Sequence, residues 1–472
     1  MSELDLIIKN GTVIGPGWVK ETNIGIKNDK IVQLGATDTK GYRVIDASGL
    51  IVSPGGIDPH THIEAYFMGA QVPEDWTKAT IASAHGGTTT VLDFAGLEKS
   101  NPNDTLISIV DKKLERAKKM SVVDYSVKPM LKNSFFQSVE ELKSMIHELI
   151  KKGVPGFKVF TAYRDLGIYT DDKALYEIMN VVKDEKAVLQ IHAENGLIEE
   201  ANRESLTKEG KKDAYYHYVA KPDFVENMAI RTSMELASVT GCPTYIVHQS
   251  TKDGFQIISK YRMNGLNVFS ETCPQYLILS NEMLRNNEKG RYYICSPPLR
   301  EPSVLDSMWT GLVNGKVQTV GSDHVPFTIE QKLAFEEFTK VPNGMPGIET
   351  RVPLLFSEGV IKGRMSLQRF AEVTSTNAAK IFGIYPRKGT IQVGSDADLV
   401  IIDPKAKHGL KAEDLHMGTD LSVYEHMVCN GWPKYTILRG EVIIDNGEFL
   451  GKPGYGKFVE GDVNKDVLST VY

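Results

Sequence analysis

The sequence predicts an α/β protein in two parts, a large parallel α/β domain and a smaller β-domain that uses both chain ends. Short β-segments separated by Asn-Gly and Gly turns occupy the two ends of the chain, whereas the middle alternates strand-like and helix-like segments. A length of 472 residues with 41% hydrophobic side chains is sufficient for one large core and one smaller one.

The β-domain is expected to combine residues 1–53 with residues 387–472. Neither end alone has enough strands for a stable two-layer sheet, so the two ends should meet in one discontinuous domain. The strand-like segments are Asp5–Lys9, Thr12–Ile14, Asn23–Ile26 and Lys30–Leu34, and then Asp398–Ile402, Tyr435–Gly440 and Glu441–Gly447.

The middle of the chain, residues 54–386, is expected to form a TIM barrel. Eight successive βα units suit a closed barrel with insertions better than an open doubly wound sheet. Glu74–His85 and Val139–Lys152 carry apolar residues at helical spacing between the strands. The eight strand candidates are 51–58, Thr88–Phe94, Asp124–Leu131, Gly156–Tyr163, Ala187–Glu194, Pro243–Ser250, Asn267–Thr272 and Gln318–Asp323.

Composition narrows the class of partner. The net charge is −6 and the basic residues are dispersed, so there is no basic field for nucleic acid or an anionic membrane. The acidic start Met1-Ser2-Glu3 is unlike a signal peptide, and no apolar run is long enough for a membrane span. The four cysteines show no C-x-x-C spacing and are expected to be reduced. These features predict a cytoplasmic protein acting on a small molecule.

The stretch His60-Thr61-His62 carries the first chemical signal. Alternate residues of an extended segment project on the same side, so both imidazoles can ligate one divalent ion or serve two adjacent ions. Taken alone, the pair could equally be two surface or core histidines.

The other residues of ligand type fall at the ends of predicted barrel strands. Active sites of TIM barrels are built at the carboxyl ends of several strands. Each residue alone has an ordinary alternative, such as a buried hydrogen-bonded histidine or a snorkelling lysine. Together they predict one metal site, formed by His60, His62, Lys158, His192, His248 and Asp323.

Five motifs resemble the binuclear-metal amidohydrolase superfamily. They are His60-Thr61-His62, Gly156-Phe157-Lys158-Val159-Phe160, Ile191-His192-Ala193-Glu194, Val247-His248 and Gly321-Ser322-Asp323-His324-Val325-Pro326-Phe327. Further stretches resemble the dihydropyrimidinase and hydantoinase branch, the cyclic amide hydrolases. These are Glu271–Leu277, Cys295–Arg300, Pro342–Glu349 and Pro386–Ile391.

The resemblance implies a distorted TIM barrel flanked by a β-sandwich, and two divalent metal ions. His60, His62 and Asp323 would hold one ion, His192 and His248 the other, and Lys158 would bridge both as a carbamate. An ammonium has no acceptor lone pair, whereas the carbamate is an anion with two oxygens. Zinc is the default metal for this ligand set, with manganese, cobalt and iron left open.

The same resemblance assigns the remaining roles. Asp323 would also carry the proton from the nucleophile to the leaving nitrogen, and Tyr163 would hydrogen-bond the developing oxyanion. Ser296 and Asn343 would bind the rest of the ring, mostly through backbone groups. Tyr163 has one alternative, a rim aromatic that only packs. A homotetramer is implied as well.

The predicted activity is hydrolysis of hydantoins or dihydropyrimidines to N-carbamoyl amino acids. The alternatives are an allantoinase- or dihydroorotase-like enzyme and, in another class, a non-catalytic scaffold, which the complete ligand set disfavours. Ala65-Tyr66-Phe67 and Met345 depart from the resemblance and are expected to line the mouth that receives the ring substituent.

Glu64 bears on the dihydroorotase alternative. Dihydroorotases carry an arginine at its place to pair with the substrate carboxylate. If Glu64 points into the pocket, like-charge repulsion and the missing arginine should make turnover of dihydroorotate at least about a hundredfold less efficient than that of dihydrouracil or a 5-monosubstituted hydantoin.

Seven histidines are expected to bind no metal, although His324 adjoins Asp323 and could support it. They are His85, His147, His217, His324, His408, His416 and His426.

Overall fold

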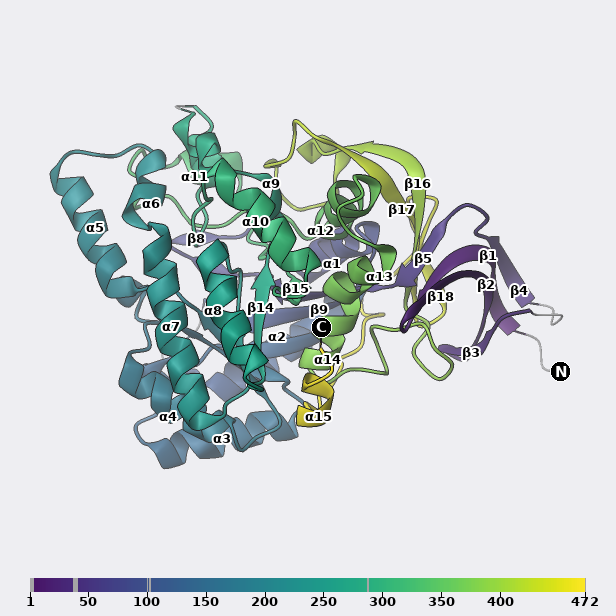
Figure 1. Cartoon of the computed structure of the whole chain (residues 1–472), viewed down its shortest axis with the longest axis horizontal. Helices are drawn as coiled ribbons and strands as arrows, with labels where there is room; N and C mark the ends of the chain where they lie inside the picture. Colours follow the sequence, from purple (N-terminus) through teal and green to yellow (C-terminus); the bar gives the residue numbers. More distant parts are fainter. Residues whose placement is uncertain (1–3, 37–40, 100, 102, 287, 472) are drawn as a thin grey trace.

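The computed structural model describes residues 4–36, 41–99, 101, 103–286 and 288–471. A large α/β body carries a smaller sheet at one end (Figure 1). Residues 1–3 of the acidic start lie outside the described ranges. In the part of the chain that is described, no helix combines the length and apolarity needed to cross a bilayer.

The large body is a barrel of parallel strands, as the sequence predicts. β6, β9 and β10 form one run, and β11 to β15 form a second run in chain order. Parallel bridges from Met130 to Lys158 and from Thr61 to His324 join the two runs at both seams, which closes the ring. The strands are β6 (Gly56–Thr61), β9 (Thr88–Ala95), β10 (Asp124–Pro129), β11 (Gly156–Phe160), β12 (Val188–His192), β13 (Thr244–Ile246), β14 (Val268–Thr272) and β15 (Thr319–Val320).

Helices cover the outside of this ring (Figure 1). The two helices expected at Glu74–His85 and Val139–Lys152 are confirmed as α1 (Trp76–His85) and α3 (Val139–Lys151). Each begins after a capping side chain, Asp75 or Ser138, that accepts a hydrogen bond from a backbone N–H of the first turn. The other long barrel helices are α2 (Leu106–Met120), α4 (Asp172–Val182), α7 (Asp223–Thr240), α8 (Lys252–Met263) and α10 (Pro302–Val313).

Further helices occupy the connections and the end of the barrel. They are α5 (Gly196–Lys208), α6 (Tyr215–Ala220), α9 (Pro274–Ile278), α11 (Ile329–Leu333), α12 (Arg351–Leu355), α13 (Leu367–Ala371) and α14 (Asn377–Ile381). The α5–α6 pair lies between β12 and α7, so it is an insertion into the fifth βα unit.

The first predicted strand, 51–58, divides in two at Gly55. β5 (Ile51–Pro54) pairs with strands of the end sheet, whereas β6 pairs with β9 of the barrel. A Cβ added to Gly55 would lie 2.2 Å from the Thr89 hydroxyl oxygen, so the crossing between the two sheets has no room for a larger residue.

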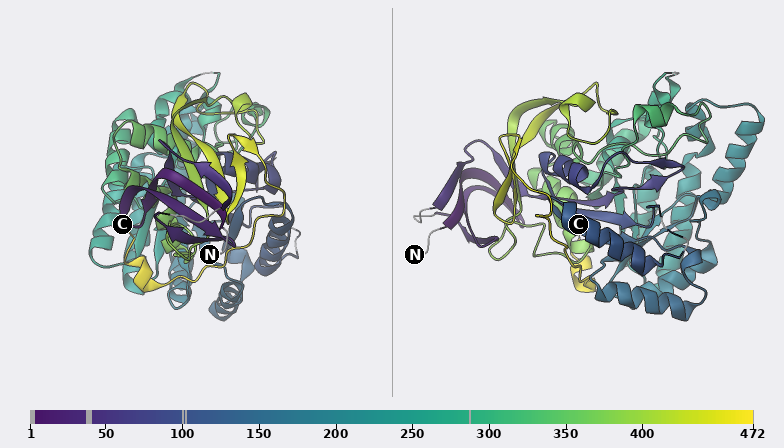
Figure 2. Two further views of the ribbon diagram at one scale, coloured as in Figure 1. Left: turned by 90° about the vertical axis from the view of Figure 1, so that its right-hand side faces the viewer. Right: turned by 180° about the vertical axis from the view of Figure 1, so that it is seen from behind.

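The smaller domain draws strands from both ends of the chain, as predicted. Its strands form one sheet, with β5 and β16 as the antiparallel pair that joins the two chain ends. Figure 2 shows the purple strands of the N-terminal part beside the yellow-green strands of the C-terminal part. The sheet curls, because backbone hydrogen bonds also link Asp29 and Ile31 to the segment before β16. The strands are β1 (Leu4–Gly15), β2 (Trp18–Lys27), β3 (Lys30–Leu34), β4 (Gly41–Asp46), β5, β16 (Leu399–Gly409), β17 (Val428–Leu438), β18 (Glu441–Asp445) and β19 (Glu448–Phe449).

The chain after β19 returns to the barrel. A parallel bridge joins Phe458 to Tyr125 of β10, and α15 (Lys465–Leu468) packs near α14. The C-terminal tail therefore braces the barrel at the end opposite the carboxyl ends of its strands, because Tyr125 lies near the start of β10.

Candidate active site

The predicted site residues converge at the carboxyl ends of the barrel strands. One small cavity, about 40 Å³, is lined by His62, Lys158, His192, His248 and Asp323 together with Tyr163, Ser296 and Asn343. His60 is fully buried beside them, with its Nε2 3.1 Å from Asp323 Oδ1. The fold therefore brings together every residue that the sequence predicted for the site.

His60, His62 and Asp323 form one group. The Nε2 atoms of the two histidines are 3.2 Å apart, and Asp323 Oδ1 lies 3.1 and 3.4 Å from them. Ligand atoms around one ion at about 2.1 Å are spaced by roughly 3.0–3.4 Å, so this triangle has the edge lengths of one coordination sphere.

His192 and His248 form the second group. His192 Nδ1 lies 2.8 Å from His248 Nε2, and the ring of His248 lies 5.3 Å from the ring of His60 between centroids. Ligand-type atoms of His60, His248 and Asp323 lie within 4.8 Å of one another, so the second pair of histidines faces the same volume as the first group.

Two buried glutamates orient these rings. Glu271 contacts His60 Nδ1 at 2.6 Å, and Glu194 contacts His192 Nε2 at 2.8 Å. Each carboxylate accepts one ring N–H, which leaves the other nitrogen of that ring unprotonated toward the cavity. The sequence interpretation gave neither glutamate a role. Glu194 stands two residues after His192 and so projects on the same side of the strand, which was an available signal.

Lys158 has the properties that carboxylation requires. Its side chain is fully buried, and its amine has no hydrogen-bond partner among the described residues. Burial lowers the pKa of Lys158 to about 7, so much of the amine is neutral near pH 7 and has the lone pair that carbon dioxide requires. An unpartnered amine among four histidines and Asp323 fits a bridging carbamate and two divalent ions.

Three site residues adopt left-handed backbone conformations that are uncommon outside glycine. The φ angles are 35° for His248, 48° for Asp323 and 64° for Tyr163. Each follows a barrel strand, where the sharp turn directs a side chain into the cavity. Such strain concentrates at functional sites.

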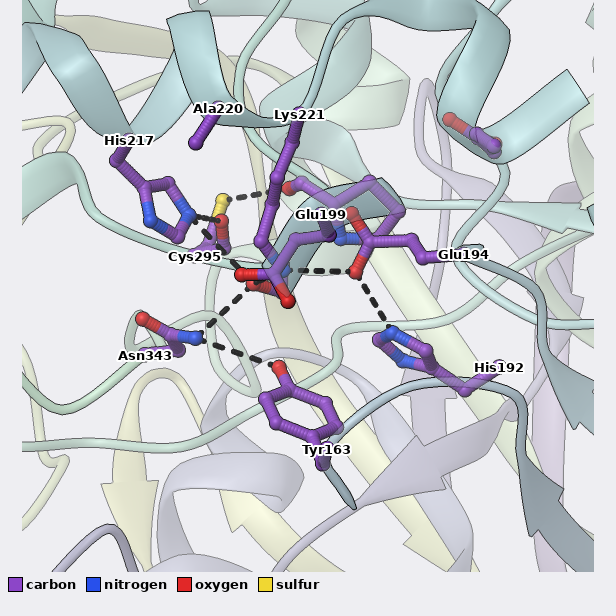
Figure 3. Close-up of polar contacts among 12 residues, drawn as sticks. Tyr163, His192, Glu194, Glu199, His217, Ala220, Lys221, Cys295 and Asn343 are labelled. Atoms are coloured by element: carbon purple, nitrogen blue, oxygen red, sulfur yellow. Dashed lines mark hydrogen bonds and ion pairs between the residues drawn. The ribbon is translucent and has the colours of Figure 1, made fainter. Parts of the chain in front are cut away.

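Tyr163, Ser296 and Asn343 line the same cavity, and Figure 3 shows the Tyr163 hydroxyl facing the Asn343 side chain. The amide nitrogen of Asn343 lies 3.3 Å from the Tyr163 hydroxyl and 3.0 Å from the Ser296 hydroxyl. Burial raises the pKa of Tyr163 to about 12, so the phenol keeps its proton and can donate it. We call Tyr163, Ser296 and Asn343 the polar end of the cavity.

Lys332 of α11 holds the backbone of this polar end. Its buried amine donates to the carbonyl oxygens of Ile294 at 2.8 Å and Pro342 at 2.7 Å, which lie two residues before Ser296 and one before Asn343. The two segments are thereby tied together although they come from different βα connections.

Apolar side chains complete the cavity wall. Phe67, Leu97, Phe160 and Val325 line it, so Phe67 is the residue of the 65–67 segment that lies among the cavity-lining residues. Met345 is only 3% exposed and its backbone pairs with Val325, so it packs behind the wall instead of lining the mouth as predicted.

Glu64 does not point into the active-site cavity, which was the condition for its expected effect on dihydroorotate. Its carboxylate is bound by Arg116, with Arg116 Nε at 2.6 Å. Glu64 lines a separate cavity of about 500 Å³ between the 64–78 segment and α2, in which none of the predicted ligands lies. The left-handed φ of 59° turns Glu64 away from the site, so the expected repulsion of dihydroorotate has no basis.

A second cluster of histidines has a different geometry. His85 and His416 stack face to face at 3.4 Å with planes 4° apart, and Glu349 contacts His416 Nδ1 at 2.8 Å. Imidazole lone pairs lie in the ring plane, so two parallel rings do not direct them at one point.

His324 contacts Glu74 and accepts from the Gly347 N–H at 3.0 Å, which supports the loop after Asp323.

Comparison with known proteins agrees with this geometry. The model of the amidohydrolase family matches residues 51–443. The chain belongs to this family. This amidohydrolase is 40% identical to a D-hydantoinase of Geobacillus stearothermophilus over 458 residues, which is 96% of each chain. It is 36% identical to a dihydropyrimidinase of Rattus norvegicus, covering 96% of this chain and 88% of the relative.

The fold comparison gives the same result. A crystal structure of a dihydropyrimidinase from Brevibacillus agri NCHU1002 superposes with a TM-score of 0.91 at 37% identity, over 97% of this chain and 99% of the other. The resemblance to the dihydropyrimidinase and hydantoinase branch is thereby confirmed over nearly the whole length of the amidohydrolase.

Proposed function

We propose that this protein hydrolyses the ring amide bond of 5-substituted hydantoins or dihydropyrimidines and releases N-carbamoyl amino acids. The observation that carries the proposal is the single cavity in which four histidines, Lys158 and Asp323 face a polar end made by Tyr163, Ser296 and Asn343. The names of the relatives, D-hydantoinase and dihydropyrimidinase, support the same reaction class.

His60, His62 and Asp323 would hold one divalent ion, and His192 and His248 a second. Lys158, carboxylated on Nζ, would bridge them, and zinc is the metal that suits this donor set best. When bound, such ions lower the pKa of water and polarise a carbonyl group. The orienting glutamates and the unpartnered buried amine support the assignment.

Asp323 would act as the proton carrier. It lines the cavity and can accept the proton that the attacking water loses as its oxygen bonds to the ring carbonyl carbon. The same proton then passes to the ring nitrogen while the C–N bond breaks, since an amide anion is a poor leaving group. Protons and electrons balance without another reactant.

Tyr163 would donate its phenolic O–H to the carbonyl oxygen as negative charge develops there. Its raised pKa, near 12 through burial, keeps the proton on the phenol throughout. Ser296 and Asn343 would bind the remaining amide and carbonyl of the ring. The apolar side chains of Phe67, Leu97 and Phe160 would face the substituent on the ring.

The assembly and location are part of the same proposal. We infer a homotetramer from the family resemblance. The four cysteines are free and buried, which is compatible with a reducing compartment such as the cytoplasm.

Metal analysis combined with a substrate panel tests the function. The purified protein should contain close to two divalent ions per chain and should open dihydrouracil or a 5-monosubstituted hydantoin faster than allantoin or dihydroorotate. Prolonged chelation should abolish ring opening. Full activity with less than one metal per chain would refute the paired-ion site. A metal-loaded protein that opens none of the four rings would refute the enzyme assignment.

A further inference from the structure

A short hairpin carries Phe67, one of the apolar side chains that line the active-site cavity. Its strands are β7 (Tyr66–Phe67) and β8 (Ala70–Gln71). The carboxamide of Gln71 closes the base of the hairpin by donating to the backbone carbonyls of the two residues before β7, each at 3.0 Å. A two-stranded hairpin is marginally stable by itself, so its position depends on the elements that hold it.

Gln331 of α11 holds this hairpin from outside the cavity. Its Nε2 donates to the backbone carbonyl of Gln71 at 2.7 Å, and its Oε1 accepts from the backbone N–H of Thr328 at 2.9 Å. The Thr328 hydroxyl accepts in turn from the Gln331 N–H at 3.1 Å, so the two residues form a capping box at the start of α11. Both ends of the Gln331 carboxamide are engaged, which fixes its direction.

The next residue of α11, Lys332, contacts a different part of the cavity wall. Its ammonium donates to the backbone carbonyls of Ile294 and Pro342. The Ile294 carbonyl also accepts from the Gly344 N–H at 3.0 Å, so the backbone segments of the polar end are held to each other and to α11. One helix therefore contacts the hairpin through Gln331 and the polar end through Lys332.

The start of α11 is fixed by the smaller domain. The segment between β16 and β17 supplies Asp420, whose Oδ1 accepts from the Ile329 N–H at 2.8 Å. It also supplies Thr419, whose hydroxyl donates to the Phe327 carbonyl at 2.9 Å. These contacts hold the first residue of the helix and the chain that leads into it, so α11 is a fixed support for both walls.

The hairpin and the polar end also meet directly, but these contacts do not fix the gap between them. The rings of Phe67 and Tyr163 pack edge to face with their centroids 5.4 Å apart, and the Asn343 N–H donates to Met68 Sδ at 3.4 Å. Aromatic pairs attract over centroid separations of about 4.5–7 Å, and a thioether is a weak acceptor. The gap must therefore be set by the hydrogen bonds from α11.

We propose that α11 sets the gap between the hairpin of Phe67 and the polar end, with Gln331 as a positioning residue for the substituent on the ring and Lys332 as one for the ring itself. The inference rests on the proposed function and deepens it, because it assigns recognition of the ring and of its substituent to two adjacent side chains. Loss of the Gln331 contact should reduce only the gain from a substituent, whereas loss of the Lys332 contacts should weaken binding of every ring.

Gln331→Glu isolates the contact with the hairpin. Glutamate at this position of a capping box keeps the acceptor for the Thr328 N–H, but its carboxylate has no N–H to donate to Gln71. Gln33→Glu is the matched control, because Gln33 of β3, in the smaller domain, also donates its Nε2 to a backbone carbonyl, that of Ala36 at 2.7 Å. The metal content of every variant is measured.

Hydantoin and 5-isopropylhydantoin separate the two roles, since they share one ring and differ only in the substituent. Gln331→Glu should lower the ratio of kcat/KM for the substituted over the unsubstituted ring about fivefold, the usual loss for one neutral hydrogen bond, with Tm close to that of the wild type. Lys332→Met should raise KM about tenfold for both rings and leave the ratio unchanged, because it loses hydrogen bonds from a charged group. Gln33→Glu should change neither quantity.

A double-mutant cycle tests whether Gln331 acts through Phe67. In the Phe67→Ala background, Gln331→Glu should change the ratio less than about twofold, because the side chain that the hairpin positions is absent. The proposal is wrong if the single variant keeps the wild-type ratio, or if the fivefold fall persists without the Phe67 ring. It is also wrong if Lys332→Met leaves KM for both rings unchanged.

Hydrogen exchange followed by mass spectrometry tests the same coupling without turnover. Gln331→Glu should speed exchange in residues 64–72 at least about threefold and leave residues 341–346 unchanged, and Lys332→Met should show the reverse. Exchange that is unchanged in both segments would overturn the proposal. If the wild type opens neither ring, the proposed function fails, while this pattern still decides whether α11 holds the two walls. If Lys332→Met does not fold, Lys332→Gln, which keeps a donor, replaces it and should show a smaller effect of the same kind.

Discussion

The two ends of the cavity are held by different means. At the end that carries the proposed metal ligands, here called the metal end, His60, His192 and their neighbours stand on or directly after barrel strands, where the parallel register places Phe160 opposite His192. At the polar end, Ser296 and Asn343 lie in long connections, positioned by side-chain hydrogen bonds from residues such as Lys221 and Lys332. Substitutions at the metal end should therefore remove the chemistry, whereas those at the polar end should change affinity and rate with the metals retained.

Loss of the bridge tests the metal end most severely. Lys158→Ala should lower kcat/KM by roughly a thousandfold or more, because the two proposed ions would lose their common ligand. Metal content should fall in parallel, and a short carboxylic acid should restore part of both. Lys158→Arg is the matched variant and should stay inactive, since a guanidinium forms no carbamate. Near-normal turnover by the Arg variant would show that only a positive charge is needed.

Loss of the phenol tests the polar end. Tyr163→Phe should lower kcat about a hundredfold, the usual cost of removing one oxyanion donor. Metal content should remain at the wild-type level, which distinguishes the two ends. Tyr169→Phe, on the same loop, serves as the control and should keep normal kinetics. A Tyr163→Phe enzyme with unchanged kcat would leave Tyr163 as a packing residue.

Replacing Glu194, the carboxylate that contacts His192, should have a smaller effect than the substitutions of Lys158 and Tyr163. Glu194→Gln weakens the acceptor of the His192 N–H, so affinity for the second ion should fall about tenfold. Competition with a chromogenic chelator measures this. Glu199, which lies 3.9 Å from Lys221 and is close to the site, gives the control variant Glu199→Gln with little expected change. Equal metal loss in both variants would mean that general charge, not the His192 contact, is responsible.

Removing the charge of Glu64 should have the smallest effect. Glu64 pairs with Arg116, whose side chain is 55% exposed. Neither residue lines the active-site cavity. Glu64→Gln should therefore change the ratio of kcat/KM for dihydrouracil and dihydroorotate less than about twofold. A tenfold gain for dihydroorotate would show that Glu64 does act on the bound ligand.

The sequence by itself predicted the barrel, the joined ends and the six residues of the proposed ligand set. Strands alternating with helices leave few topologies, and a TIM barrel gathers the carboxyl ends of its strands at one face. His60, Lys158 and His192 could be brought together in this way because strand order and direction alone place them there.

Only the tertiary structure decided where the side chains between those strands point. Glu64 follows the second histidine by two residues, yet its left-handed turn and Arg116, fifty-two residues away, direct it to another cavity. Lys221 meets Ser296 across seventy-five residues of sequence. Strand periodicity specifies a side chain's direction within a sheet, whereas loops lack such a repeat, so contacts between loops arise only when the packed chain brings their partners together.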